Sequence, residues 1–484
     1  MEQQIRVRDC AATTPKVAMA ERRALVVDLE GVLLRSDLAQ EALFSNAARS
    51  LACLRDAVLG GKGALLDQVL AAAEIDYAHL PYDTDVLNLG LAARAQGRKI
   101  YIAVTRYPDH ATAIAAHLGF DGIVTLADLT AGAETTNRAT PPFDAGSFDY
   151  IGNGRAPESV WRAACTTYVV GGSDHLSKRL ELLNPSLKRI GGRDTSWRTW
   201  LNALRVHQYA KNTLVFVPAL TSHQVNLASL GSAFLAFMAF SACASSAYLL
   251  NDLFDLAADR QHPSKRYRAI ASGALPISTA LIAIPILWIA SAIAGLSISS
   301  VFVAILGAYL ATTMAYSLFL KKKMLVDIVT LAGLYTVRIL GGAVAIGVYL
   351  SEWLMVFSLF VFTSLALIKR YSELAMRQES GLSNPVNRDY RISDLQIVAA
   401  MAAASGMNAI TVLSLYVSSP VVAQAYSRPW MLWLLNPLLL YWIGRALMLA
   451  HRREMADDPI VYTFKDNASR IVVLAMMCIV LAAI

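Results

Sequence analysis

A short polar stretch, NDLFDLAADRQHPSKRYR at 251–268, follows a long apolar run. If a helix continues through it, Asn251, Asp255 and Asp259 fall at i, i+4 and i+8 on one face, with Asp252 within about a quarter-turn. Carboxylates packed in this way repel one another, so the arrangement requires a counter-charge. Mg²⁺ fits, because it prefers oxygen ligands and is often held by one or two carboxylates together with substrate phosphates. The stretch therefore predicts a magnesium site with the ligands Asn251, Asp252, Asp255 and Asp259.

Cations complete the same stretch, in the order His262, Lys265, Arg266 and Arg268. Arg binds phosphate oxygens as a fork and Lys binds them as a point charge. Metal and cations together indicate a diphosphate site, in which His262 is a turn residue or a phosphate donor. The alternative is a solvated, salt-bridged helix end, but surface pairing does not require three Asp and an Asn on one stripe.

The elements that position this stretch are membrane helices. With 56% hydrophobic and 16% charged residues the chain is too apolar for a soluble protein, and the apolar residues gather after residue 200. Segments of membrane-spanning length recur there. We expect about nine spans, the first and last of them short: 209–222, 228–250, 277–296, 299–319, 325–347, 352–370, 396–418, 429–450 and 469–484.

The basic residues predict the orientation of these spans. Lys and Arg lie in the loops after the second, fourth, sixth and eighth spans, whereas the alternate loops hold only Arg428. The positive-inside rule then puts the N-terminal domain and the charged loops on the cytoplasmic face of the cell (inner) membrane. The start of the chain has no apolar core, so no signal peptide is expected. The net charge of +7 follows from this topology and faces lipid, so it does not indicate nucleic-acid binding.

The Asp-rich stretch resembles the NDxxDxxxD signature of the UbiA superfamily of intramembrane prenyltransferases. Its second half, HPSKRYR, resembles the HPxKRxRP extension of the decaprenyl-phosphate phosphoribosyltransferase branch, with Ala269 in place of the Pro. The resemblance covers about 200–484 and implies an all-α polytopic membrane bundle. It also implies that Asp252, Asp255 and Asp259 are catalytic.

Further segments carry the same resemblance. LRVHQYAKNTLVFVPAL is similar to the start of the family's first span, and AYSLFLKKKMLVDIVTLAGLYTVRILGGA is similar to its second motif. The residues at matching positions, implied to be catalytic or substrate-binding, are Lys211, Asn212, Tyr316, Lys321, Asp327 and Arg338. Lys369, Arg370 and Glu373, and later ADDPIVYTFKDNASR at 456–470, also resemble that branch, which implies that Lys369 and Arg370 bind substrate. Ordinary loop charge is the alternative, and it explains Asp457, Asp458 and Asp466 equally well.

Each of three matching residues also has a purely structural interpretation. Lys211 could be a snorkelling anchor at the interface, and Asp327 could cap the start of its helix. Arg338 is the most informative, because a charge in mid-span costs at least a few kcal/mol unless it is paired or faces a polar cavity. A buried ion pair is the structural alternative for Arg338.

The resemblance implies Mg²⁺-dependent transfer of phosphoribosyl from phosphoribosyl pyrophosphate to a polyprenyl phosphate. A competing interpretation keeps the fold: a polyprenyl diphosphate ionises at the same site and alkylates an aromatic or other acceptor. Many aromatic-acceptor members have two Asp residues in the second motif, whereas this chain has only Asp327, which favours phosphoribosyl transfer. A transporter or lipid-binding scaffold would predict polar residues along a path and internal repeats.

Residues 1–195 predict a separate α/β domain. ALVVD, KIYIAVT, GIVTL, FDYIGN and TTYVVGG read as short strands, and a helix ending at Gly119 follows the second. Strands that alternate with helices predict a parallel three-layer sheet. The helix-rich stretch at about 38–95 is expected to form a cap, and the boundary with the membrane domain is expected at 185–200.

VVDLEGVLLRSD resembles the DxDGTLL nucleophile motif of HAD-type phosphatases, and AVTR resembles their second motif. The likeness implies a nucleophile at Asp28 and an acid/base at Glu30. Several features depart from that family: Glu30 replaces Asp, no Lys occurs between 100 and 177, and Asn153, Pro157 and Glu158 stand where Mg²⁺-binding acids are expected. A degenerate regulatory or assembly domain is therefore favoured over a phosphatase that would remove the 5-phosphate from its neighbour's product.

Overall fold

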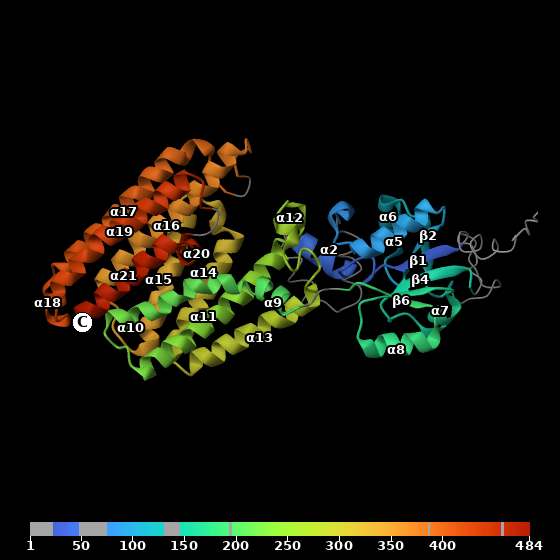
Figure 1. The fold of residues 1–484 in the computed structure, drawn as a ribbon, viewed down its shortest axis with the longest axis horizontal. Coiled ribbons are helices and arrows are strands. Elements are labelled where there is room, and N and C mark those ends of the chain that lie inside the picture. The colour runs from blue at the N-terminus through green and yellow to red at the C-terminus, as the bar shows by residue number, and fades with distance from the viewer. Residues whose placement is uncertain (1–22, 48–74, 130–145, 193–195, 386–387, 456–458) are drawn as a thin grey trace, which may run out of the picture. The chain divides into compact units, whose positions relative to one another are not determined.

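The computed structural model describes residues 23–47, 75–129, 146–192, 196–385, 388–455 and 459–484 (Figure 1). Two compact units divide the chain. One contains the N-terminal residues up to Trp200 together with Asp252–Ala280, and the other contains Leu201–Asn251 and Leu281–Ile484. Most of the predicted cap, at 48–74, lies outside the described residues, as do Asp457 and Asp458.

A six-stranded parallel sheet organises the N-terminal unit and confirms the predicted α/β architecture. Its strand order is β3-β2-β1-β4-β5-β6. The strands are β1 Ala24–Asp28, β2 Ile100–Val104, β3 Gly122–Thr125, β4 Phe148–Gly152, β5 Thr167–Val170 and β6 Leu187–Ile190. Strand order reverses between β1 and β4, and in such sheets ligands bind outside the carboxyl ends of the strands at this point.

Both faces of the sheet are covered, which explains why β2 and β4 are buried at every residue. The β1 side chains alternate between two cores: Leu25 and Val27 point into one, and Val26 points into the other. Helices α5 Thr84–Ala95 and α6 Pro108–Leu118 contribute to the first core, and α7 Glu158–Ala163 and α8 Asp174–Leu183 contribute to the second. Two further helical elements described before residue 80 are α2 Leu38–Ala47 and the 3₁₀ turn η1 Tyr77–His79.

The Asp-rich stretch does not form the continuous helix predicted from its periodicity. Helix α11 Leu227–Phe254 ends at Phe254, α12 covers only Leu256–Gln261, and a 3₁₀ turn η3 follows at Lys265–Tyr267. Asp255 lies at the break, with φ −89° and ψ 6°. At the other end His262 is extended, with ψ 132°, because the following proline disfavours the helical region for the residue before it.

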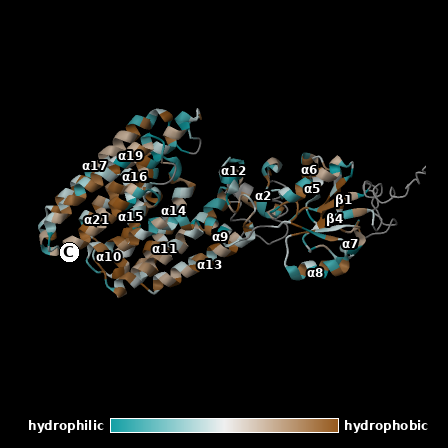
Figure 2. Ribbon diagram, in the orientation of Figure 1, coloured by the Kyte–Doolittle hydropathy of each residue, from teal (hydrophilic) through white to brown (hydrophobic). Residues whose placement is uncertain are grey.

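Seven described helical segments are long and apolar enough to cross a membrane, or up to eight if one bent pair counts as a span. Figure 2 shows hydrophobic residues along these long helices and in strands β1 and β4. The seven are α11, α13 Ile277–Leu296, α14 Ser300–Leu318, α15 Val326–Ile346, α16 Glu352–Glu379, Ile392–Val417 (η5 and α17 Leu395–Val417) and Pro429–His451 (η6 and α19 Leu435–His451). The bent pair, α20 Pro459–Lys465 and α21 Asn467–Ala483, turns by 92°.

The expected count of nine spans is therefore not reached in the described part of the chain. The segment expected at 209–222 forms a 3₁₀ helix, η2 Val206–Phe216, followed by the short α10 Val217–Thr221. A short helix, α9 Trp197–Ala203, precedes them. Polar residues before 213 leave this region too short an apolar run for one full span.

Side-chain exposure along α13 fits a helix that faces lipid. Ile282, Ile286, Ile289 and Ile293 recur every three or four residues and are each more than half exposed. Such spacing puts them on one helix face. A row of exposed isoleucines is costly in water and suited to hydrocarbon.

Candidate active site

Arg268 links two acids of the Asp-rich loop, a name that we use for residues 252–273. Its Nη1 lies 3.1 Å from Oδ1 of Asp252 and 2.6 Å from Oδ2 of Asp259. Both carboxylates are buried, whereas the Arg268 side chain is 28% exposed. Lys265 approaches from the solvent side, with Nζ 4.0 Å from Oδ1 of Asp259. Two acids more than one helical turn apart in sequence thus converge on one cation.

The loop's electrostatics show that these acids need a positive neighbour. Burial raises the pKa of Asp259, and the charge of Asp252 adds to this, while Arg268 and Lys265 act in the opposite direction. The fold has thus withdrawn a carboxylate from water and compensated it with cations. Any ligand that draws Arg268 away must bring positive charge in its place.

The acidic residues of the loop could bind Mg²⁺ together with the phosphates of a substrate. Among the described residues no group of three or more His, Cys, Asp or Glu side chains could hold a metal ion. Asp252 and Asp259 supply two convergent carboxylates, and one or two carboxylates are what Mg²⁺ commonly takes from a protein when substrate phosphates complete its shell. Asn251, in the last turn of α11, and Asp255, at the helix break, flank this pair in the chain.

The remaining predicted cations of the loop lie outside this acid pair. Arg266 packs against its neighbour, with Nη2 2.8 Å from the Tyr267 hydroxyl and the guanidinium 4.9 Å from that ring. His262 Nδ1 accepts from the backbone N–H of Ser264 at 3.2 Å and of Lys265 at 3.4 Å. The ring of His262 therefore closes the turn after α12.

A second polar cluster is buried in the membrane unit and brings Asn212 and Arg338 together. Arg338 Nε donates to Oδ1 of Asn212 at 2.7 Å, Nη2 donates to the Tyr309 hydroxyl at 2.8 Å, and Nη1 donates to the Leu334 carbonyl. Asn212 in turn donates to Ser241 Oγ at 3.0 Å. None of these partners is an acid, so within the described residues the suggested ion pair of Arg338 is absent.

Lys211 belongs to the same cluster. It is buried, and its Nζ lies 5.7 Å from the ring centroid of Tyr335. The Arg338 guanidinium also lies 5.7 Å from the Tyr335 ring and 4.8 Å from that of Tyr309. Aromatic faces stabilise cations that have left water. The cluster thus holds two cationic side chains beside the same aromatic ring, that of Tyr335.

A third cluster surrounds Asp327, the second residue of α15. Asp327 is fully buried and accepts from Arg370 Nη2 at 2.7 Å and from the Tyr390 hydroxyl at 2.7 Å, with Arg388 Nη1 at 3.5 Å. Arg370, itself 1% exposed, also pairs with Glu373. The charge of the Asp327 carboxylate is therefore already balanced by Arg370, as in a structural ion pair.

Arg388 extends the third cluster toward Tyr316 on α14. Burial lowers the pKa of Arg388, but Glu373, Tyr316 and Asp327 outweigh this and leave it raised. The guanidinium is therefore held firmly in its charged form. The two other predicted residues of this region lie close by in the chain: Lys321 in the turn η4 Leu320–Lys322 and Lys369 on α16, directly before Arg370.

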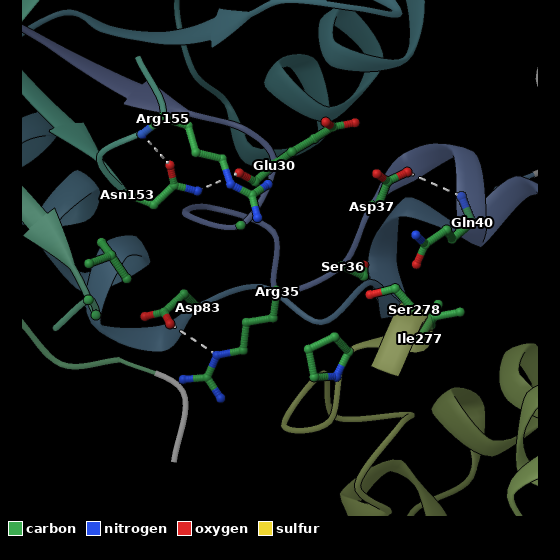
Figure 3. A pocket seen from close by; sticks show the side chains of 15 residues that line it. Glu30, Arg35, Ser36, Asp37, Gln40, Asp83, Asn153, Arg155, Ile277 and Ser278 are labelled. Carbon is green, nitrogen blue, oxygen red and sulfur yellow. Dashed lines mark hydrogen bonds and ion pairs between the residues drawn. The ribbon is translucent and has the colours of Figure 1, made fainter. Parts of the chain in front are cut away.

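The sheet domain contains a separate cavity of about 480 Å³ (Figure 3). It lies at the carboxyl ends of the strands, where Glu30 follows β1, Asn153 and Arg155 follow β4, and Gly171 follows β5. Polar side chains from the segment Arg35–Gln40, Asp83 and the segment 276–278 complete the lining. Position and lining match what a parallel sheet offers to a polar ligand at its switch point.

Asp28 ends β1 close to this cavity but does not line it. Burial raises the pKa of Asp28 to about 6, the Tyr150 phenol acts in the opposite direction, and Glu30 raises it slightly further. Burial and Asp37 also raise the pKa of Glu30. Both predicted HAD positions therefore favour the neutral acid more than a solvated carboxyl does.

The positions where magnesium-binding acids were expected have other roles. Asn153 Nδ2 donates to the backbone carbonyl of Glu30 at 3.3 Å and Oδ1 accepts from the Arg155 N–H at 3.2 Å. Pro157 precedes α7 as its N-cap. Glu158 forms an exposed pair with Arg179 at 2.6 Å.

Comparison with known proteins decides the family. The sequence model described as "UbiA prenyltransferase family" matches residues 213–468, more than half of the chain. The chain belongs to the UbiA prenyltransferase family. It is therefore an integral membrane transferase, and the match includes Asp252, Asp255, Asp259, Asp327 and Arg338.

The similarity of this UbiA-family chain to one relative extends beyond the membrane domain. A Sinorhizobium fredii protein, y4nM, is 31% identical over 92% of this chain and 88% of its own. The nodulation protein NoeC of Azorhizobium caulinodans is 34% identical over 57% of this chain and 91% of its own. Decaprenyl-phosphate phosphoribosyltransferase of Corynebacterium glutamicum is 32% identical over 37% of this chain and 56% of its own.

Solved structures also align with the UbiA-family bundle. A UbiA homolog from Archaeoglobus fulgidus bound to GPP and Mg²⁺ covers 59% of this chain and 99% of its own, with 13% identity and a TM-score of 0.45.

Sequence reasoning missed several residues that belong to these polar clusters. Tyr309 and Tyr390 contact Arg338 and Asp327 through their hydroxyls, and Arg388 joins the third cluster. An aromatic in an apolar span gives no signal of such a role, although a polar Tyr–Arg pair in a basic loop could have drawn notice. Glu41 pairs with Arg260 across 219 positions, and nothing in the sequence indicates this contact.

Proposed function

We propose that this UbiA-family protein transfers phosphoribosyl from phosphoribosyl pyrophosphate to a polyprenyl phosphate and releases diphosphate. The observation that carries the proposal is the convergence of Asp252 and Asp259 on Arg268. A site with two buried acids and a partly exposed cation suits a ligand that combines phosphates with a divalent metal. The HPSKRYR extension, and relatives named decaprenyl-phosphate phosphoribosyltransferase, favour this donor.

The reaction divides between bond breaking and charge stabilisation. An oxygen of the lipid phosphate attacks C1 of the ribosyl group as the bond from C1 to the diphosphate oxygen breaks, and the electron pair leaves with diphosphate. Bound Mg²⁺ would neutralise charge on that leaving group. Asp252, Asp255, Asp259 and Asn251 would hold the metal, while Lys265 and Arg268 would bind phosphate oxygens. Because the nucleophile is already anionic, no strong general base is required.

The cluster around Arg338 supports an anionic ligand in the membrane unit. Its partners are an amide, a phenol and a carbonyl, so the positive charge of Arg338 is hydrogen-bonded but not neutralised. A buried charge of this kind is costly in a membrane and marks functional positions. We assign Lys211, Asn212 and Arg338 to the binding of a substrate phosphate.

A prenyltransferase that uses a polyprenyl diphosphate is the alternative. The same acids and metal would assist departure of its diphosphate, and the allylic cation would alkylate an aromatic or other acceptor. The single acid of the second motif argues against it, because Asp327 is neutralised by Arg370. The orientation inferred above, with charged loops on the cytoplasmic face of the inner membrane, serves both donors.

For the sheet domain we propose a regulatory or assembly role. Its likeness to HAD-type phosphatases rests on Asp28 and Glu30, and the raised pKa of Asp28 disfavours the anionic nucleophile that such chemistry uses. Asn153, Pro157 and Glu158 are committed to the backbone or to solvent-exposed contacts. Release of phosphate from a phosphosugar lipid by the full chain, lost in Asp28→Asn, would contradict this role.

The test of the main proposal uses purified protein with Mg²⁺, labelled phosphoribosyl pyrophosphate and polyprenyl phosphate. We expect a lipid-extractable labelled product from wild type and none from Asp255→Asn or Asp259→Asn. Asp174→Asn is the matched control, because the Asp174 side chain is 86% exposed and far along the chain from the Asp-rich loop. Product only with a polyprenyl diphosphate would favour the alternative, and inertness with both donors would favour a scaffold.

A further inference from the structure

A buried ion pair ties the Asp-rich loop to the sheet domain. Arg260 lies next to Asp259 on α12, and Glu41 lies on α2. Nη2 of Arg260 donates to Oε1 of Glu41 at 2.7 Å, and Nη1 donates to Oε2, so the pair is bidentate. Their side chains are only 6% and 5% exposed. A planar fork held by a carboxylate in this way fixes orientation as well as distance.

Arg260 also fixes the far end of the loop. Its Nε donates to the backbone carbonyl of Ala271 at 3.0 Å. The Arg260 guanidinium therefore connects α12, the helix that carries Asp259, to the segment that follows Arg268. The acid and the cation that meet at the proposed diphosphate site are both within a few residues of these two attachments.

Two further contacts join the loop to the sheet domain. Gln261 Nε2 donates to Oδ2 of Asp76 at 3.0 Å. At Gly273, with φ +70°, a Cβ would come within 2.6 Å of Arg35 Cβ and 3.3 Å of Pro81 Cβ, so a larger residue does not fit without movement. These contacts agree with the chain's division, in which Asp252–Ala280 and the N-terminal residues form one compact unit.

We propose that Glu41 is a positioning residue for the Asp-rich loop, acting through Arg260. The sheet domain then supplies part of the framework of the transferase site, whatever chemistry its own cavity has. This inference rests on the proposed function only for its consequence. The mechanical link from Glu41 to α12 stands on the contacts alone.

Hydrogen exchange in the full-length protein tests the link. In Glu41→Gln we expect amides of 256–262 to exchange at least tenfold faster, with amides of β1 and β4 unchanged. The matched control is Asp149→Asn, which breaks another buried pair of the same domain, Arg98 Nη2 to Asp149 Oδ2 at 2.5 Å. That control should leave the exchange of 256–262 unchanged. Unchanged exchange there in Glu41→Gln, or equal acceleration in both variants, overturns the proposal.

A double variant separates positioning from general loosening. If the two side chains act through each other, Glu41→Gln combined with Arg260→Gln should exchange no faster than Arg260→Gln alone. Additive acceleration would mean that Glu41 acts on the loop by another route, which contradicts the proposal.

A binding readout tests the consequence without the reaction. We expect Mg²⁺ with inorganic diphosphate to raise the melting temperature of wild type, and the Mg²⁺ concentration for half of this effect to rise about tenfold in Glu41→Gln but not in Asp149→Asn. No rise in Glu41→Gln overturns the positioning role, whereas no stabilisation of wild type counts against the diphosphate site of the proposed function. Stabilisation of wild type without product from either donor would instead count against the proposed function alone.

Discussion

Replacing Asp327 by Asn tests whether this residue stabilises the folded protein or binds the reactants. Asp327 and Arg370 are 0% and 1% exposed and lie 2.7 Å apart. Removing one partner of such a buried pair leaves an uncompensated charge and costs about 3–5 kcal/mol. Glu373 still pairs with Arg370, and an Asn keeps an acceptor for the Tyr390 hydroxyl, so we expect the lower end, about 3 kcal/mol.

The assay is thermal unfolding of the detergent-solubilised full-length protein. A loss of about 3 kcal/mol corresponds to a fall in melting temperature on the order of 10 °C. Glu379→Gln is the control in the same unit: it breaks an exposed pair with Arg453, at 3.0 Å, and should cost less than about 1 kcal/mol. The double variant Asp327→Leu with Arg370→Met should recover much of the loss, because apolar residues can replace a buried pair.

One result would refute this reasoning. If Asp327→Asn melts with wild type but forms no product, Asp327 serves the reactants and its contact with Arg370 adds little to stability. The reverse pattern is expected for Asp259→Asn, which lies at a site partly open to solvent: little change in melting temperature, and loss of product.

Three further predictions test the fold and its electrostatics. Gly342→Ala should destabilise the membrane unit, because its Cβ would clash with the Val215 carbonyl oxygen. Gly333→Ala, with open space around it, should be neutral or stabilising by about 0.5–1 kcal/mol in thermal unfolding. Asn212→Ala should cost about 1–3 kcal/mol in the same assay, because Arg338 Nε loses its acceptor; a melting temperature equal to wild type would contradict that bond. The pKa of Asp28 is raised from 3.8 to about 6, so the folded sheet domain binds the extra proton and should lose stability, on the order of 2–3 kcal/mol, as pH rises from about 4 to 6. Hydrogen exchange of β1 and β4 in the full chain should show this dependence in wild type and not in Asp28→Asn.

Local sequence was sufficient for the elements whose neighbours in space are also neighbours in the chain. Five strands of the sheet were predicted from short apolar runs, whereas β6, LKRI, is half polar and shows no such run. The helix of 108–118 ends at Gly119, with φ +69°, where a glycine was expected to close it. The continuous helix through the Asp-rich stretch was wrong, since periodicity cannot show the break at Asp255.

The sequence by itself determined that the chain is a membrane transferase with an acidic motif beside cations, because hydropathy and motif spacing are local properties. Only the tertiary structure decided what those charges face. In the structure Asp327 forms an ion pair with Arg370, Arg338 donates hydrogen bonds to neutral groups, and Arg260 forms an ion pair with Glu41. The physical reason is that the cost of burying a charge depends on partners that are brought close by folding, and those partners lie tens to hundreds of residues away in the chain.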